Sequence, residues 1–158
     1  SGSIMRHGVE EGVSMKMNVE RILATKCSNV VVVRPDDSIR EALALLARHN
    51  IGALVVVDET NHPMGILSER DIVRGAARNE AIFDQRVDSL MTQEVIITSP
   101  TDDARLVART MTEKRFRHLP VVDNGDLVGI ISIMDVVRTQ RDQYEGQVES
   151  LQTRLSTV

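Results

Sequence analysis

Cysteine and aromatic residues are almost absent from this sequence of 158 residues. It has one cysteine, Cys27, no tryptophan, one tyrosine and two phenylalanines. A single cysteine can form neither an internal disulfide nor a cysteine-rich metal site, which favours a reducing compartment, and we expect the cytoplasm. With 2% aromatic residues, the chain lacks a stacking platform for single-stranded nucleic acid. Its core must therefore be built from aliphatic residues and methionine.

Long apolar runs and a strong net charge are also missing. No run approaches the roughly 18 apolar residues of a membrane-spanning helix, and no secretory signal is evident. A net charge of −4 gives no general attraction to nucleic acid or anionic lipid. The basic cluster Lys114–His118 is short and has no recognition helix beside it. We therefore expect no nucleic-acid partner and no membrane partner.

Catalytic motifs are equally scarce. The histidines, His7, His49, His62 and His118, are scattered along the chain, no nucleophile has a plausible base, and there is no glycine-rich phosphate loop. We therefore expect no enzymatic activity, no catalytic cofactor and no metal site.

Most of the sequence consists of one unit that occurs twice. Val30, Pro35 and Asp37 match Val95, Pro100 and Asp102, and the apolar run before Asp58 matches the one before Asp123. After a shorter turn, Gly65–Ser68 and Asp71–Arg74 match Gly129–Ser132 and Asp135–Arg138. We therefore expect an α/β (α+β) fold of two pseudo-twofold-related repeats that share a core.

Each repeat is predicted to have the order strand, helix, strand, strand, helix. In the first copy the predicted elements are a strand at 30–33, a helix at 39–49 that Ser38 caps, strands at 54–57 and 65–67, and a helix from Ser68 to about residue 77. The second copy repeats this order from Val95 to about Arg141. Matching lead-ins at 19–23 and 87–91 are expected to form short helices and to complete the two halves.

These patterns divide the chain into four segments. Residues 1–17, which begin with the tag-like Ser1–Gly2–Ser3, are expected to be a flexible N-terminus, 18–78 the first repeat and 79–141 the second. Residues 142–158 are expected to form an amphipathic C-terminal helix. Its apolar residues recur at steps of four and three, which predicts packing on a second chain or back on this one. The seam consists of Tyr144, Val148, Leu151, Leu155 and Val158.

The doubled Gly-Ile-x-Ser-x-x-Asp, each copy after a run ending Val-Val-Asp, resembles the cystathionine-β-synthase (CBS) domain, which occurs in tandem as a Bateman module. The resemblance covers about residues 19–139, and the chain is similar to small stand-alone bacterial CBS-pair proteins. It implies clefts between the repeats that bind adenosine-containing ligands such as AMP, ADP, ATP, NAD or S-adenosylmethionine. It also implies a homodimer.

The resemblance implies that each Ser-x-x-Asp contacts ribose, because a carboxylate can accept bonds from both hydroxyls of a vicinal diol. The same spacing is a helix capping box, and one residue pair can serve both purposes. In the first cleft, Ser132 and Asp135 would hold the ribose, while Arg117 and His118, with Lys26, would face a phosphate. Apolar side chains would enclose the adenine there. Alternatively, these side chains simply belong to the hydrophobic core. These are Val31, Ile51, Ala53 and Ile130, with Gly52 beside them.

The second cleft would use the first repeat's Ser68 and Asp71. Ile66, Thr92, Ile96 and Phe116 would line it, and Arg70 is the nearest cation. Because Gly52 and Ala53 align with Arg117 and His118, we expect the Asp135 cleft to be the better phosphate site. Lys114 and Arg115 are interpreted as a solvated helix end, and a purely structural role for His118 stays open.

The function expected from these features is a non-enzymatic sensor that binds an adenosine nucleotide between its repeats and changes the interaction with a protein target by population shift. The alternative is a scaffold protein whose clefts are vestigial. The sequence names neither the target nor the ligand.

Overall fold

The computed structural model describes residues 17–26 and 30–148. The first repeat follows the predicted order of elements. They are β1 (Val32–Val33), α3 (Ile39–His49), β2 (Ala53–Val57), β3 (Pro63–Ser68) and α4 (Glu69–Arg78). The second repeat contains α5 (Ala104–Lys114), β4 (His118–Asp123), β5 (Asp126–Ser132) and α6 (Ile133–Val148). The α/β class and the two repeats are thus confirmed.

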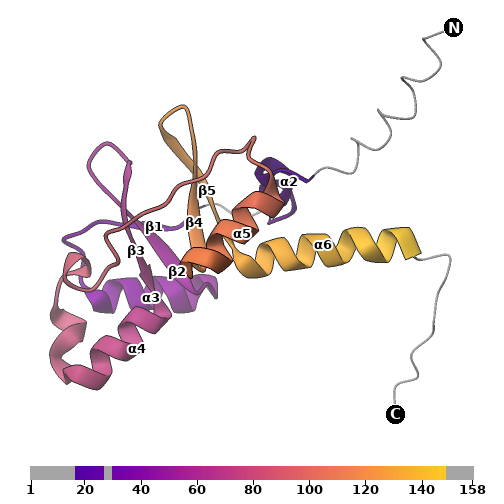
Figure 1. The fold of residues 1–158 in the computed structure, drawn as a ribbon. Helices are drawn as coiled ribbons and strands as arrows, with labels where there is room; N and C mark the ends of the chain where they lie inside the picture. The colour runs from indigo at the N-terminus through magenta and orange to yellow at the C-terminus, as the bar shows by residue number, and fades with distance from the viewer. Residues whose placement is uncertain (1–16, 27–29, 149–158) are drawn as a thin grey trace, which may run out of the picture.

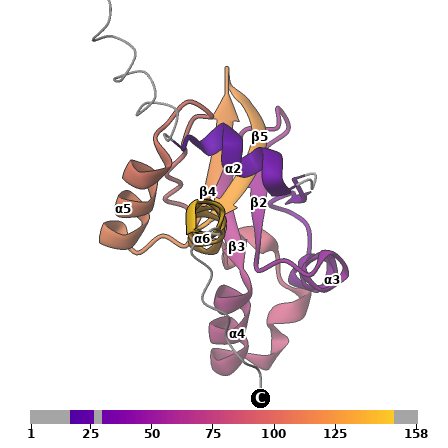
Figure 2. The same ribbon diagram turned by 90° about the vertical axis from the view of Figure 1, so that its right-hand side faces the viewer.

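The lead-ins are helical, as their pattern predicted. The first forms α2 (Val19–Lys26), and the second forms the 3-10 helix η2 (Val87–Ser89), which follows another, η1 (Glu80–Asp84). Figures 1 and 2 show the β2–β3 and β4–β5 hairpins side by side, with α3 and α4 toward one end of the molecule and α2, α5 and α6 around the other.

Local signals determine where the helices begin. Ser38 caps α3, because its hydroxyl accepts a hydrogen bond from the Glu41 N–H while the Glu41 carboxylate accepts one from the Ser38 N–H. Asn50 ends the helix in the left-handed region at φ 52°, a conformation that asparagine tolerates better than most residues. Ser68 and Asp71 form the same reciprocal pair at the start of α4, and Ser132 and Asp135 form it at α6.

The first strand of the second repeat is reduced to a single bridge, so the strand predicted from Val95 is wrong. In the first repeat β1 runs parallel to β2, with Val32 opposite Val55 and Val33 opposite Val56. In the second repeat only Thr98 pairs, with Val121. The position equivalent to Val55 is Pro120, which has no N–H to donate, and the ladder therefore cannot extend.

Each lead-in completes the core of the other repeat. Val19 and Ile22 of α2 are fully buried in a core with β4, β5, α5 and α6, while Val87 is fully buried against β1, α3 and β2. Equivalent main-chain bonds secure both: the Val19 N–H donates to Asp102 O at 3.0 Å, and the Val87 N–H donates to Asp37 O at 2.8 Å. The two halves are therefore interlocked rather than simply stacked.

Glycines mark where the lead-ins cross the hairpins. A Cβ at Gly129 would lie 2.5 Å from Cδ2 of Leu23, and one at Gly65 would lie 2.5 Å from Sδ of Met91. At these distances the facing side chain would have to shift to make room for a Cβ. The glycine of Gly-Ile-x-Ser-x-x-Asp thus lets the opposite lead-in pass close over the strand.

The chain ends differ in part from the predicted segments. Met17, assigned to the flexible N-terminus, is buried in the second core, and its carbonyl accepts a bond from the Ala104 N–H. The predicted boundary at residue 142 falls inside α6, which is continuous from Ile133 to Val148. Tyr144 of the predicted seam is 70% exposed; the other seam side chains and the tag-like segment lie outside the described residues. Within the described ranges, no helix has both the length and the apolarity to cross a bilayer.

Candidate functional site

A cavity of about 400 Å³, the Asp135 cleft, lies between the two repeats. The start of β2 in the first repeat forms one wall, and the end of β5 with the first turns of α6 forms the other. Its lining residues are Lys26, Val31, His49, Asn50, Ile51, Gly52, Ala53, His118, Ile130, Ile131, Ser132, Asp135 and Arg138. Residues from three distant parts of the sequence therefore meet here, as the resemblance implied.

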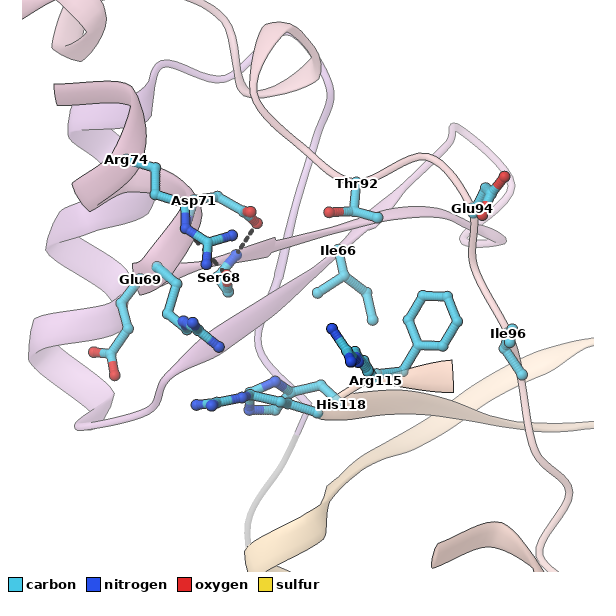
Figure 3. A pocket seen from close by; sticks show the side chains of 13 residues that line it. Ile66, Ser68, Glu69, Asp71, Arg74, Thr92, Glu94, Ile96, Arg115 and His118 are labelled. Carbon is cyan, nitrogen blue, oxygen red and sulfur yellow. Dashed lines mark hydrogen bonds between the residues drawn. The ribbon is translucent and has the colours of Figure 1, made fainter. Parts of the chain in front are cut away.

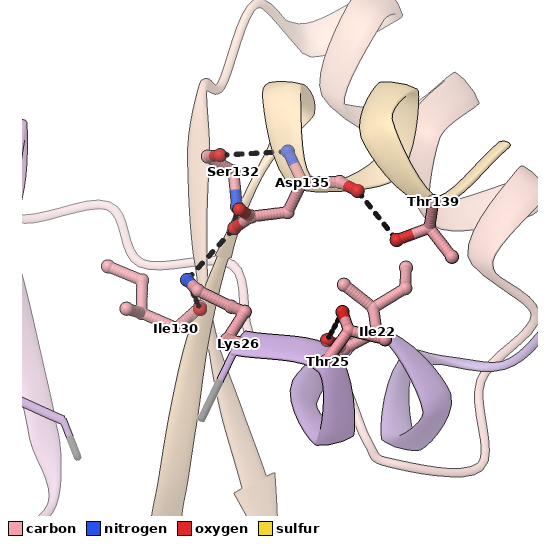
Figure 4. Close-up of polar contacts among 7 residues, drawn as sticks. All are labelled: Ile22, Thr25, Lys26, Ile130, Ser132, Asp135 and Thr139. Carbon is pink, nitrogen blue, oxygen red and sulfur yellow. Dashed lines mark hydrogen bonds and ion pairs between the residues drawn. The ribbon is translucent and has the colours of Figure 1, made fainter. Parts of the chain in front are cut away.

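Lys26 holds the Asp135 carboxylate. Its ammonium lies 2.9 Å from Asp135 Oδ2 and also donates to the Ile130 carbonyl at 2.7 Å. The Ser132 N–H donates to the same Oδ2 at 2.8 Å. Among the described residues Oδ1 has no partner, so it can accept a hydrogen bond from a ligand hydroxyl. Figure 4 shows Lys26 reaching from the end of α2 to the start of α6.

Burial and these contacts have opposite effects on the Asp135 pKa. Burial disfavours the carboxylate, but the Lys26 and Ser132 hydrogen bonds outweigh it, and the pKa of Asp135 lies below its ordinary value. Burial is also the main cause of the lowered pKa of His118. The charges of Lys26 and Arg117 lower this pKa further, whereas those of Asp135 and Glu69 raise it. At neutral pH the cleft therefore holds a carboxylate paired with an ammonium, beside a neutral imidazole.

A second cavity of about 270 Å³, the Asp71 cleft, is the pseudo-symmetric counterpart. Here the Ser68–Asp71 cap at the start of α4 faces the segment that precedes β4 (Figure 3). Its lining residues are Ile66, Ser68, Glu69, Arg70, Asp71, Arg74, Thr92, Glu94, Ile96, Arg115, Phe116, Arg117 and His118. Every residue expected for this cleft is present.

The Asp71 cleft carries most of the guanidinium groups. Arg70 and Arg74 come from α4, and Arg115 and Arg117 come from the opposite repeat. None of the four side chains forms a hydrogen bond or ion pair with another described residue. Asp71 accepts a bond from the Ser68 N–H at 2.9 Å, but no lysine neutralises it within the described ranges. This cleft therefore has more guanidinium groups than the Asp135 cleft, although three carboxylates, Asp71, Glu69 and Glu94, also line it.

The expected position of Arg117 is wrong. We expected it in the Asp135 cleft with its own repeat's Ser and Asp, but it lines the Asp71 cleft, while His118 lines both. The reason is that the two repeats are assembled crosswise, so that each cleft combines the Ser-x-x-Asp of one repeat with the facing strand of the other; we call this the crossed assembly. The start of β2 faces the Ser-x-x-Asp of the second repeat, and the start of β4 faces that of the first. Lys26, Val31, Ile51, Gly52, Ala53 and Ile130 do lie with Ser132 and Asp135.

Sequence reasoning missed several lining residues. Arg74 and Arg138 are the same position of the two repeats, three residues after each Asp, and both line a cleft. The repeated Asp-x-x-Arg was a usable signal, because residues three apart share a helix face. Arg115, interpreted as a solvated helix end, is exposed but lines the Asp71 cleft. It ends α5 with φ 61°, and nothing in the sequence indicates that turn.

Each cleft can hold a polyhydroxylated ligand. A carboxylate with one oxygen free lies beside apolar surface from the opposite repeat, and unpaired cations lie nearby. Such a site can accept hydrogen bonds from a diol, enclose a flat ring and neutralise an anion. In the part of the chain that the structure describes, no group of three or more His, Cys, Asp or Glu residues is arranged to hold a metal ion.

Comparison with known proteins agrees with this geometry. The CBS domain family model matches residues 19–78 and 87–142. The solved structure of the CBS-domain containing protein ATU1752 from Agrobacterium tumefaciens is similar, with 42% identity and a TM-score of 0.74; the match covers 78% of this chain and 99% of that one. A 17.7 kDa protein of Acidianus ambivalens is 37% identical over 134 residues, which are 84% of this chain and 79% of that protein.

Ligands are bound in a further similar structure. The CBS domain pair of protein MJ0100, solved in complex with 5′-methylthioadenosine and S-adenosyl-L-methionine, is 29% identical and has a TM-score of 0.73. The match covers 81% of this chain and 98% of that one.

Proposed function

This chain belongs to the CBS domain family as a tandem pair, and we propose that it is a non-catalytic sensor whose Asp71 cleft binds an adenosine nucleotide through ribose and phosphate. The observation that carries the proposal is the meeting of the Asp71 carboxylate with four unpaired guanidinium groups across the repeat interface. The adenosyl ligands of the similar MJ0100 domain pair support an adenosine compound as the ligand class.

The residues divide the ligand between them. Asp71 Oδ1 accepts from the ribose hydroxyls, and Ile66, Ile96 and Phe116 provide apolar surface for the base. Arg117, with the other guanidinium groups of the cleft, neutralises phosphate, because a planar guanidinium donates two parallel bonds to phosphate oxygens. We expect AMP, ADP or ATP here rather than an uncharged nucleoside. NAD also presents ribose and phosphate.

A nucleotide in this cleft would link the two repeats, since Asp71 belongs to the first and Arg117 to the second. It would therefore favour the relative arrangement of repeats in which both contacts form, and so alter the surface offered to a protein target. The target is expected to be a protein, with no role for nucleic acid or membrane, in a cytoplasmic setting. This population shift is the proposed signal.

Titration calorimetry with AMP, ADP, ATP and NAD tests the proposal, with matched substitutions in the two clefts. Replacing Asp71 by asparagine removes a charge-assisted bond worth about 1.5–3 kcal/mol, and nucleotide affinity should fall roughly ten- to a hundredfold. The Asp135→Asn variant is the control and should keep the affinity. If wild type binds none of these ligands, the chain is better described as a scaffold with vestigial clefts; if both variants bind like wild type, the site is wrongly placed.

We also propose that the chain forms a homodimer through α6. Met134, Val137 and Tyr144 are 53%, 47% and 70% exposed, and their spacing places them along one side of the helix. Sedimentation velocity of the Val137→Glu variant against wild type tests this, since a buried glutamate would dissociate the pair. A wild-type protein that sediments as a monomer at all concentrations would refute the dimer.

A further inference from the structure

Three arginines follow one side of α4. Arg70, Arg74 and Arg78 recur every four residues, so they lie one above another on the helix surface over roughly 12 Å. All three are exposed, and none of their side chains pairs with another described residue. We call these three residues the arginine row.

The arginine row continues past the Asp71 cleft. Arg70 and Arg74 line that cleft, whereas Arg78 does not. Figure 3 shows Arg74 on α4 and Arg115 of the second repeat across the cavity. A nucleotide in the cleft would therefore occupy two members of the row and leave Arg78 without an anionic partner.

The row is unfavourable for the isolated helix. Like charges four residues apart repel each other, and the helix macrodipole compensates only for Arg78, which lies in the last turn. The repeat does not require the row, because the same positions of α6 are Met134, Arg138 and Asp142. The row is thus particular to the first repeat, and an anionic partner would stabilise it.

An apolar residue beside the row indicates the kind of partner. Val73 is 68% exposed, and it lies three residues after Arg70, on the same side of α4. A peptide carries apolar side chains between its carboxylates and so matches this surface, whereas the outer surface of a nucleic acid is sugar and phosphate. A second copy of this chain fits poorly, since a symmetric contact through α4 would bring two arginine rows together.

We propose that α4 is the docking surface for an acidic segment of a protein target, whose carboxylates bind the arginine row and whose apolar side chain packs on Val73. A nucleotide phosphate in the Asp71 cleft then competes with this segment for Arg70 and Arg74. The competition rests on the proposed nucleotide function and gives it an output, because nucleotide binding releases the target. The docking surface itself does not depend on that function.

Fluorescence anisotropy with a short labelled peptide tests the docking surface. The peptide has glutamate at positions i, i+4 and i+8 and one leucine between them, and its dye is uncharged. We expect wild type to bind it and Arg78→Glu to bind it about tenfold more weakly, because like charges then face each other. Since Arg78 does not line the Asp71 cleft, its substitution should change nucleotide affinity less than twofold.

Two comparisons make the test specific. Arg21→Glu is the matched control, because Arg21 is exposed on α2, away from α4 (Figures 1 and 2), and this variant should bind the peptide like wild type. Val73→Thr should weaken binding of the leucine peptide but not of the same peptide with alanine in place of leucine. ATP added to the wild-type complex should displace the peptide.

The outcomes separate the docking surface from the nucleotide function. If wild type does not bind the peptide, or if Arg78→Glu binds it equally well, the docking surface is overturned whatever the calorimetry shows. If ATP binds in calorimetry but leaves the peptide bound, the competition alone is overturned. If ATP does not bind at all, the proposed nucleotide function and the competition fail, while peptide binding that Arg78→Glu weakens still supports the docking surface.

Two further results would assign the row to another partner. Tighter binding of a single-stranded oligodeoxynucleotide of the same net charge as the peptide, lost in Arg78→Glu, would show that the row takes nucleic acid. Loss of self-association in Arg78→Glu, measured by sedimentation velocity, would show that a second copy covers α4. Either result overturns the acidic segment as the occupant.

Discussion

Replacing Lys26 by methionine should destabilise the fold by about 1–2 kcal/mol at neutral pH. The substitution keeps most of the apolar stem of Lys26 but removes the ammonium that pairs with Asp135 at 2.9 Å and donates to Ile130 at 2.7 Å. The Asp135 side chain is 9% exposed, so the carboxylate cannot regain in water what it loses. Only the Ser132 contacts would remain to stabilise its charge.

The magnitude follows from the exposure of the two partners. A hydrogen bond to a charged group contributes about 1.5–3 kcal/mol. The Lys26 side chain is 26% exposed, and solvent therefore screens part of the interaction, which reduces the expected loss to about 1–2 kcal/mol. For a chain of this size, each kcal/mol corresponds to roughly 2–4 °C in Tm. We therefore expect Tm to fall by roughly 2–8 °C.

The loss should depend on pH in a defined direction. The folded-state pKa of Asp135 lies below its ordinary value, so its ionisation stabilises the fold fully above the unfolded-state pKa near 4 and less as pH falls through the folded-state pKa. Without Lys26, burial is less opposed and the pKa of Asp135 rises. The difference between wild type and Lys26→Met should be largest at pH 6–8 and should shrink below about pH 4.

Urea unfolding at several pH values, monitored by circular dichroism, measures this difference. Arg105→Met is the matched control, because Arg105 lies 3.9 Å from Asp103 in an exposed pair, with its side chain 68% exposed, and its loss should have no measurable effect. The reasoning is refuted if Lys26→Met unfolds like wild type at pH 7, or if the same deficit persists at pH 3.

Four further substitutions test the packing, a helix cap and the buried histidine. Gly75→Ala should lower the free energy of unfolding in urea by about 1–3 kcal/mol, because its Cβ would lie 2.8 Å from Leu90 Cδ1. Gly146→Ala is the control: this position lies in α6 with nothing within 4 Å of a Cβ, and the substitution should stabilise the fold by about 0.5–1 kcal/mol. Equal effects of the two substitutions would contradict the packing around Gly75. Ser38→Ala should lower the free energy of unfolding by about 1 kcal/mol, because it removes the cap of α3. A thermal melt that matches wild type would contradict this role. Burial lowers the pKa of His118, so protonation favours the unfolded chain, and the stability of wild type should fall as pH drops below about 6.5. In His118→Gln the slope of stability against pH should be flatter. An unchanged slope between pH 7 and 5 would show that other groups cause the pH dependence.

The elements and both Ser-x-x-Asp caps could be predicted because their causes are local. Ser38 with Glu41 specifies where α3 begins, and the predicted and observed bounds of that helix agree. The five-residue buried strand Ala53–Val57 was visible as a continuous apolar run. The repeat itself indicated that Ser68 and Ser132 would occupy equivalent positions.

The partners across the interface could not be predicted in the same way. An apolar pattern shows that Val19 and Val87 are buried, but not against which repeat, since both cores are built from the same aliphatic residues. The repeats are similar enough that straight and crossed assemblies satisfy the pattern equally. Arg117 was therefore assigned to the wrong cleft, while Lys26, at the end of a crossed lead-in, was placed correctly on the resemblance alone.

Crossed assembly also explains how one duplicated unit produces two unlike sites. Each cleft takes its carboxylate from one repeat and its facing strand from the other, so a charge placed before β4 changes the Asp71 cleft and leaves the Asp135 carboxylate untouched. Arg117 adds a guanidinium group to the Asp71 cleft, whereas Gly52, at the equivalent position, adds no charge to the Asp135 cleft, where Lys26 from α2 is the cation. Asp142 then differs from Arg78 on the helix that follows. The two clefts of one repeated unit therefore carry different charged groups, and each is lined by residues of both repeats.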